Sequence, residues 1–180
     1  MLFGSAAPGL LPGARNAVET CLAIRPGERV ALIADEASRE VAASLEQALA
    51  EVRADVRCLL IESVSARPMP SPPAAVLEAL GAADAGILCV QPQEGELAVR
   101  MAIVGLIEQR RIRYAHMVGV TPRIMREGMR ADYHQVDRLS RQLCERMPQA
   151  RTLTVRTAAG TDFTATFDPA LAWVKTSGLI

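Results

Sequence analysis

Four short apolar runs, separated by stretches long enough for a helix, occupy the first two thirds of the chain. They cover residues 29–34, 56–61, 86–90 and 114–120. Runs that are apolar on both faces are typical of parallel strands that helices cover on both sides. The helix-length segments between them favour right-handed strand–helix–strand connections. The sequence therefore predicts an α/β fold with a doubly wound, mostly parallel sheet and flanking helices.

Helical patterns fill the intervening segments. Apolar residues recur at helical spacing from Val41 to Val52, and Asp35 stands where its carboxylate can cap the first turn. The middle of the segment 97–107 is apolar nearly all round, which predicts a buried helix or an interface. Further helices are predicted at residues 14–24, 72–80, capped by Ser71, and 94–110, then in a short turn after Thr121 and from Asp132 to Met147.

The end of the chain changes character. The helix after Asp132 should turn Val136, Leu139, Leu143 and Met147 towards a core. Residues 153–157 and 162–167 alternate with a period of two around a Gly-containing turn, which predicts a β-hairpin. We therefore expect a Rossmann-like α/β domain over residues 1–150, followed by a hairpin and the start of a second, truncated domain over residues 151–180.

Charge and composition exclude several classes of protein. Twenty basic and 20 acidic residues give no net charge, and aromatic residues make up 3% of the chain. A nucleic-acid or anionic membrane surface needs clustered positive charge, so neither partner is predicted. There is no signal-peptide pattern and no apolar run long enough for a bilayer, so a cytoplasmic protein is expected. The four cysteines form no CxxC pair, which indicates free thiols.

The common nucleotide and catalytic motifs are absent. There is no GxGxxG, no GxxxxGK[ST], no GxSxG and no HExxH sequence. Ligands of open α/β sheets bind beyond the carboxyl ends of the strands. Polar residues fall there in this sequence: Asp35 and Glu36 after the first run, Gln91 after the third, and Thr121 with Arg123 after the fourth.

The best ligand-binding candidates are therefore Asp35, Thr121 and Arg123. The helix terminus at Thr121, with the charge of Arg123, could hold a carboxylate or a phosphate. Plain capping and solvation are the alternative interpretation. No catalytic or metal-binding residue is predicted. His116 is expected to be a hydrogen-bonded core residue and His134 a solvated one.

Several segments, taken in order, resemble the thermophilic-type metallo-aminopeptidases, often labelled leucyl aminopeptidases. The resemblance begins with ARNAVETC at 14–21, RPGERV at 25–30 and the Asp35-Glu36 pair. It is clearest in GVTPRIMREGMRADY at 119–133, and VRTAAGTD at 155–162 and WVKTSG at 173–178 follow. The chain also resembles the ring-opening dihydroxypyridine dioxygenases, which share this architecture and use a non-haem iron.

The aminopeptidase resemblance covers only the N-terminal half of such proteins. It implies a larger catalytic domain beyond residue 180, which would bind divalent Zn, Co or Mn and remove N-terminal amino acids from peptides. The present chain would then hold no cofactor, be inactive alone and form a homo-oligomer. Metal-dependent turnover by the chain itself would instead point to Asp35, Glu36 and His116. A non-catalytic binding or oligomerisation module is the remaining alternative.

Overall fold

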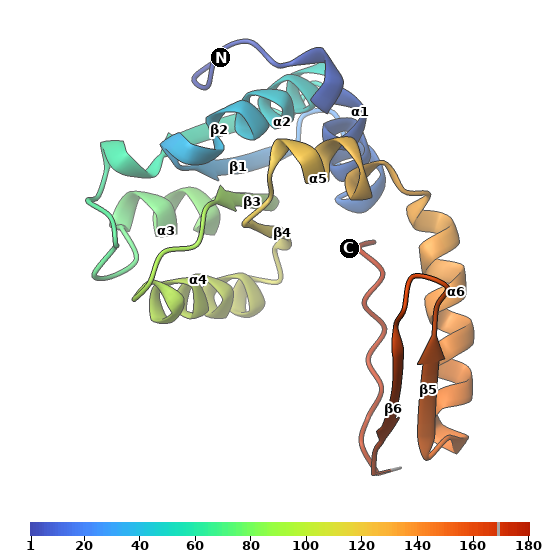
Figure 1. Ribbon diagram of the computed structural model, residues 1–180. Coiled ribbons are helices and arrows are strands. Elements are labelled where there is room, and N and C mark those ends of the chain that lie inside the picture. Colours follow the sequence, from blue (N-terminus) through green and yellow to red (C-terminus); the bar gives the residue numbers. More distant parts are fainter. Residues whose placement is uncertain (169) are drawn as a thin grey trace. The chain divides into compact units, whose positions relative to one another are not determined.

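Four parallel strands, β1 to β4, form the sheet of the computed structural model, which describes residues 1–168 and 170–180 (Figure 1). Their order is β2-β1-β3-β4, so the chain leaves β1 in one direction and returns to its other side with β3. The predicted doubly wound sheet is confirmed. The bounds are β1 Arg29–Ala34, β2 Asp55–Leu60, β3 Ala85–Val90 and β4 Arg113–Val118.

Helices cover both faces of this sheet (Figure 1). The elements α1, α2 and α5 contribute to one core, and α3 and α4 contribute to the other. The bounds are α1 Leu11–Arg15, α2 Arg39–Glu51, α3 Ala74–Gly81, α4 Leu97–Arg110, α5 Pro122–Arg126 and α6 Tyr133–Arg146. Short turns lie at Pro8–Leu10, Asn16–Cys21, Glu36–Ser38, Ile61–Ser63, Gly128–Arg130 and Met147–Gln149.

Burial follows strand position. All six residues of β3 are buried, and all but Arg29 of β1, because these two strands have a neighbour on each side and helices above and below. The outer strands β2 and β4 are only partly buried. The two central strands are therefore shielded from solvent, and the two outer strands are partly accessible to it.

The chain divides into two compact units, Met1–Ala131 with Ile180, and Asp132–Leu179. The second unit contains α6 and the antiparallel pair β5 Thr152–Arg156 and β6 Asp162–Thr166, which is the predicted hairpin. The division therefore falls before α6, whereas the sequence pattern placed it at residue 150.

Three local predictions need correction. The first helix is short, and residues 16–21 form a wider π-helical turn. The helix α3 begins after Pro73, so Ser71 is not its cap. On α6, Leu139 and Leu143 are 53% and 57% exposed rather than buried in a core, because the small second unit supplies little to cover them.

Among the described residues, no helix is both long and apolar enough to cross a bilayer.

Candidate functional site

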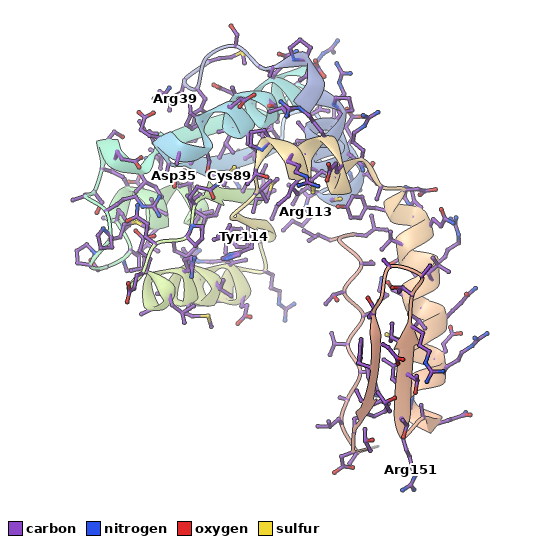
Figure 2. The ribbon with its side chains drawn as sticks, viewed as in Figure 1. Asp35, Arg39, Cys89, Arg113, Tyr114 and Arg151 are labelled. Atoms are coloured by element: carbon purple, nitrogen blue, oxygen red, sulfur yellow. The ribbon has the colours of Figure 1, made fainter. Side chains whose placement is uncertain are left out.

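Asp35 lies at the carboxyl end of β1 and is almost completely buried (Figure 2). Its Oδ1 accepts the backbone N–H of Ser38 at 2.9 Å, which is the predicted capping bond. Its Oδ2 accepts the backbone N–H of Gln91 at 2.8 Å and a bond from the Arg67 guanidinium. All three donors belong to the protein, so the carboxylate is held by internal hydrogen bonds.

Arg67 joins Asp35 to a second buried carboxylate, Glu96. The Arg67 Nε and Nη2 atoms donate to the two oxygens of Glu96 at 3.0 and 2.6 Å, and Nη2 also donates to the Gln91 carbonyl at 2.8 Å. Glu96 additionally accepts the N–H of Met69 at 2.9 Å. The Arg67 side chain is 5% exposed and that of Glu96 is 0% exposed. We refer to Asp35, Arg67 and Glu96 as the buried triad.

Two carboxylates and one guanidinium leave the buried triad one negative charge in excess, which the N–H groups of Ser38, Gln91 and Met69 help to offset. Burial opposes ionisation of Glu96, but the hydrogen bonds from Arg67 and Met69 outweigh it and lower the pKa of Glu96 below its ordinary value. Burial likewise opposes the charge of Arg67, and the two carboxylates outweigh it and raise the pKa of Arg67. Both shifts favour the charged forms of Glu96 and Arg67 at neutral pH.

The buried triad lies at the switch point of the sheet, where β1 and β3 are neighbours and ligands of such folds usually bind. Arg67 and Glu96 come from the connections after β2 and β3. The sequence pattern pointed to neither Arg67 nor Glu96 as a site residue. Arg67 begins a Pro-rich segment whose pattern indicates only a stiff loop, and only the charge at the start of the 94–110 segment could have pointed to Glu96.

Thr121 and Arg123, the other predicted ligand residues, lie after β4. Thr121 caps α5 by accepting the N–H of Ile124 at 3.3 Å. The Arg123 side chain is 82% exposed and its Nε lies 3.1 Å from Glu127. Gln91 connects this region to the buried triad, because its Nε2 donates to the Val120 carbonyl at 3.0 Å. Within residues 1–168 and 170–180, Arg123 pairs with Glu127 and makes no hydrogen bond or ion pair to this network.

The residues considered for a metal site are not brought together. Asp35 accepts three hydrogen bonds from the protein, and both oxygens of Glu36 accept from Arg39 at 2.7 Å. His116 lies on the outer strand β4 and is exposed, so its predicted place in the core is wrong. Within residues 1–168 and 170–180, no group of three His, Cys, Asp or Glu side chains is placed to hold a metal ion. The donor set present does not fit the metal that the resemblance implies.

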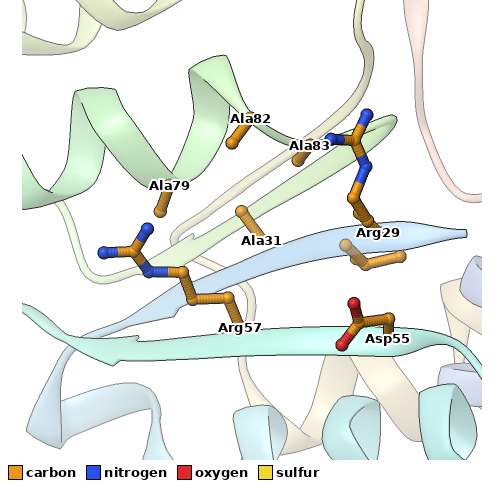
Figure 3. Close-up of a pocket in the computed structure, with 8 residues that line it drawn as sticks. Arg29, Ala31, Asp55, Arg57, Ala79, Ala82 and Ala83 are labelled. Carbon is orange, nitrogen blue, oxygen red and sulfur yellow. The ribbon is translucent and has the colours of Figure 1, made fainter.

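A pocket of about 150 Å³ opens at the opposite, amino-terminal edge of β1 and β2 (Figure 3). Alanine side chains form much of its lining, and Arg29 and Arg57 stand at its rim. Each arginine is already paired with a carboxylate, Arg29 with Asp84 at 2.8 Å and Arg57 with Glu78 at 3.2 Å. Both arginines are therefore engaged, and Asp55 is the remaining charged residue in the lining.

Fold and site together define a doubly wound α/β protein whose switch point is closed by its own side chains. No protein-family model matches the chain. No curated protein matches it. The chain is similar in structure to 2,5-dihydroxypyridine dioxygenase from Pseudomonas putida KT2440, with a TM-score of 0.54 and 18% identity. The match covers 88% of this chain and 47% of the dioxygenase, so the chain spans about half of that structure.

Proposed function

We propose that residues 1–180 form the non-catalytic scaffold half of a two-part metalloenzyme built like 2,5-dihydroxypyridine dioxygenase. The structural match supports this proposal, since it covers 88% of the chain and so extends beyond the sheet-containing unit. In this proposal the catalytic metal is held by the other half. The role of the present residues is to fold stably and to provide a surface on which that half is placed.

The side chains of the two units fit this role. In the sheet-containing unit, the buried triad uses the polar groups of the switch point for internal bonds. In the second unit, an apolar groove of about 240 Å³ lies along α6, with Leu143, Leu153 and Trp173 in its lining. Large apolar side chains are exposed on this unit: Leu139, Leu143, Leu153, Phe163, Leu171, Trp173 and Val174. Such a surface is suited to contact with another domain.

A metallo-aminopeptidase remains the alternative, on the strength of the segments 119–133 and 155–162. Both classes place the chemistry outside this chain. The similarity to the structure of a dioxygenase supports the ring-cleaving class better than the peptidase class.

A chimera tests the proposal. Residues 1–180 would replace the matched half of the Pseudomonas putida dioxygenase, and iron content and oxygen uptake with 2,5-dihydroxypyridine would be measured. We expect the chimera to load iron and cleave the ring, and the 180-residue chain alone to do neither. Val174→Asp, at a position that is 77% exposed, should impair the chimera without changing the unfolding of the isolated chain.

Two results would contradict the proposal. One is ring cleavage, or metal-dependent release of leucine from a leucyl amide, by the 180-residue chain alone. The other is a chimera that is folded and iron-loaded but does not consume oxygen with the substrate.

A further inference from the structure

The outer strand β4 and the helix α4 leave one side of the sheet-containing unit uncovered. Among residues 1–168 and 170–180, β4 pairs with β3 alone, and no described strand pairs with the N–H and C=O groups along its other edge. Exposed edges of this kind pair readily with a further strand unless charges, proline or a covering segment protect them. Arg113 is a charged residue of β4, but its guanidinium is engaged elsewhere, because Nη1 donates to the carbonyls of Leu22 and Ala23 at 2.7 and 3.0 Å. Its charge therefore does not protect the edge from pairing.

A groove of about 480 Å³ runs beside this edge. It is lined by Pro92, Leu97, Arg100, Met101, Val104, His116 and Val118. The apolar side chains of Leu97 and Met101 are 64% and 59% exposed there. Apolar walls with a cation between them suit an occupant that brings apolar side chains and a carboxylate.

The helix α4 itself offers that combination. Leu97, Arg100, Val104, Glu108 and Arg111 follow one another at intervals of three or four residues, so they form one stripe along α4 and its C-terminal cap. Arg100 and Glu108 lie four residues before and four residues after Val104. Neither forms an ion pair within the part of the chain that the structure describes.

This spacing is self-complementary under a two-fold rotation. If two α4 helices pack antiparallel with the axis at Val104, each Arg100 meets Glu108 of the partner subunit, and the two Val104 side chains meet each other. The β4 edges approach along the same axis, because His116 and Val118 line the same groove as Val104. A two-fold interface requires this kind of self-matching surface.

We propose that the α4–β4 face is a homodimer interface, in which a second copy of this chain packs antiparallel on α4 with reciprocal Arg100–Glu108 ion pairs and extends the sheet across the β4 edge. This inference is independent of the proposed enzyme class, since it uses only the sheet-containing unit.

Sedimentation of the full chain over a wide range of concentrations tests the interface by charge exchange. We expect a monomer–dimer equilibrium. Arg100→Glu and Glu108→Arg should each weaken the dimer about tenfold or more, because each places like charges opposite one another at two symmetric points. The double variant, which exchanges the two charges, should restore the dimer. Gln109→Arg, which alters charge on the side of α4 that faces α3, is the matched control and should have no effect.

Crosslinking provides a second readout that does not depend on charge. Val104→Cys should form a disulfide-linked dimer on oxidation, whereas Gln109→Cys should form no more than the unmodified chain. A folded chain that stays monomeric at all concentrations would overturn the proposal. So would a dimer that both single reversals leave intact, or one that the double exchange fails to restore. If a reversal prevents folding, as judged by circular dichroism, the Val104→Cys result decides.

Discussion

The backbone N–H of Gln91 donates to the Oδ2 atom of Asp35 at 2.8 Å, which ties the loop after β3 to the end of β1. These two strands are neighbours at the point where the order of the sheet reverses. In many doubly wound proteins a ligand occupies that place. In this protein the backbone amide of Gln91 and the Arg67 guanidinium occupy that place. The hydrogen bond between Asp35 and Gln91 therefore has a structural role.

Removing the guanidinium should leave two buried carboxylates without their counter-charge. We expect Arg67→Met, which keeps the length of the side chain, to lower the free energy of unfolding by about 3–5 kcal/mol. Arg57→Met removes an exposed arginine paired with Glu78 and should cost less than about 1 kcal/mol. Urea unfolding followed by circular dichroism gives both values. Similar losses of unfolding free energy in the two variants would show that the buried triad contributes no more to stability than an exposed ion pair.

Acid should weaken the same network through Glu96. The pKa of Glu96 is lower in the folded chain than its ordinary value of 4.5, so folding favours the ionised form. Its contribution is fully present above about pH 4.5 and is lost as the pH falls through the lower, folded pKa. The free energy of unfolding should therefore decline below about pH 4.5, and less steeply in Glu96→Gln. An unchanged acid slope in this variant would contradict the assignment.

Gly13 permits the close approach of α1 and α5. A Cβ atom at this position would collide with the backbone carbonyl of Met125, which cannot move without shifting α5. We expect Gly13→Ala to lower the free energy of unfolding by about 1–3 kcal/mol. Gly105→Ala on α4 is the control, because nothing lies within 4 Å of its Cβ position. That change should stabilise the chain by about 0.5–1 kcal/mol, and a loss there would show that alanine itself is disfavoured.

In the second unit, Asp137 fastens the C-terminal segment to α6. It accepts hydrogen bonds from Lys175 and from Ser177, the latter at 2.6 Å, and also from Arg141 at 2.8 Å; these bonds hold the pKa of Asp137 well below its usual range. Asp137→Asn should speed hydrogen–deuterium exchange of the amides between residues 174 and 179 several-fold. Asp162→Asn, which affects an exposed pair with Arg156, should not. Equal exchange in both variants would mean that packing alone holds the segment.

The imidazole of His116 should report the charge of Arg100. The ring of His116 is exposed but partly desolvated by its neighbours, which lowers its pKa, and the nearby guanidinium lowers it further. In Arg100→Gln the pKa should rise but stay below the ordinary value of 6.5, because desolvation is the larger cause. Proton NMR titration measures this shift, with the His134 signals on α6 as an internal reference. A fall in the pKa of His116 would contradict the assignment.

The sequence predicted the central part of the fold well, for a physical reason. Residues 29–34 are the bounds of β1 in both the prediction and the structure, because a strand buried on both faces has an unbroken apolar pattern. The ends of β2 and β4 shifted by one or two residues. These outer strands begin at Asp55 and Arg113, where polar residues hide the boundary.

The candidate site was harder to predict. The position of Asp35 followed from its place after β1, and its capping bond to Ser38 was expected. Its principal partner was not, because Arg67 lies 32 residues away along the chain in a segment without regular structure. His116 was assigned to the core because the sequence did not show that β4 would be an outer strand. Both errors concern pairing between distant segments, which local patterns do not encode.

The two units also differ in how far the chain must reach to form its first contacts. In β5 and β6, Arg156 pairs with Asp162 across a short turn, whereas β1 pairs with β2 across the connection that contains α2, and with β3 across a longer connection. Closing long loops slows folding more than closing short ones. The hairpin should therefore form early in refolding, while the parallel sheet and the buried triad should form in the slow step. In a cell, the ribosome synthesises the sheet-containing unit before the hairpin. The slow formation of the sheet would then begin before the fast formation of the hairpin.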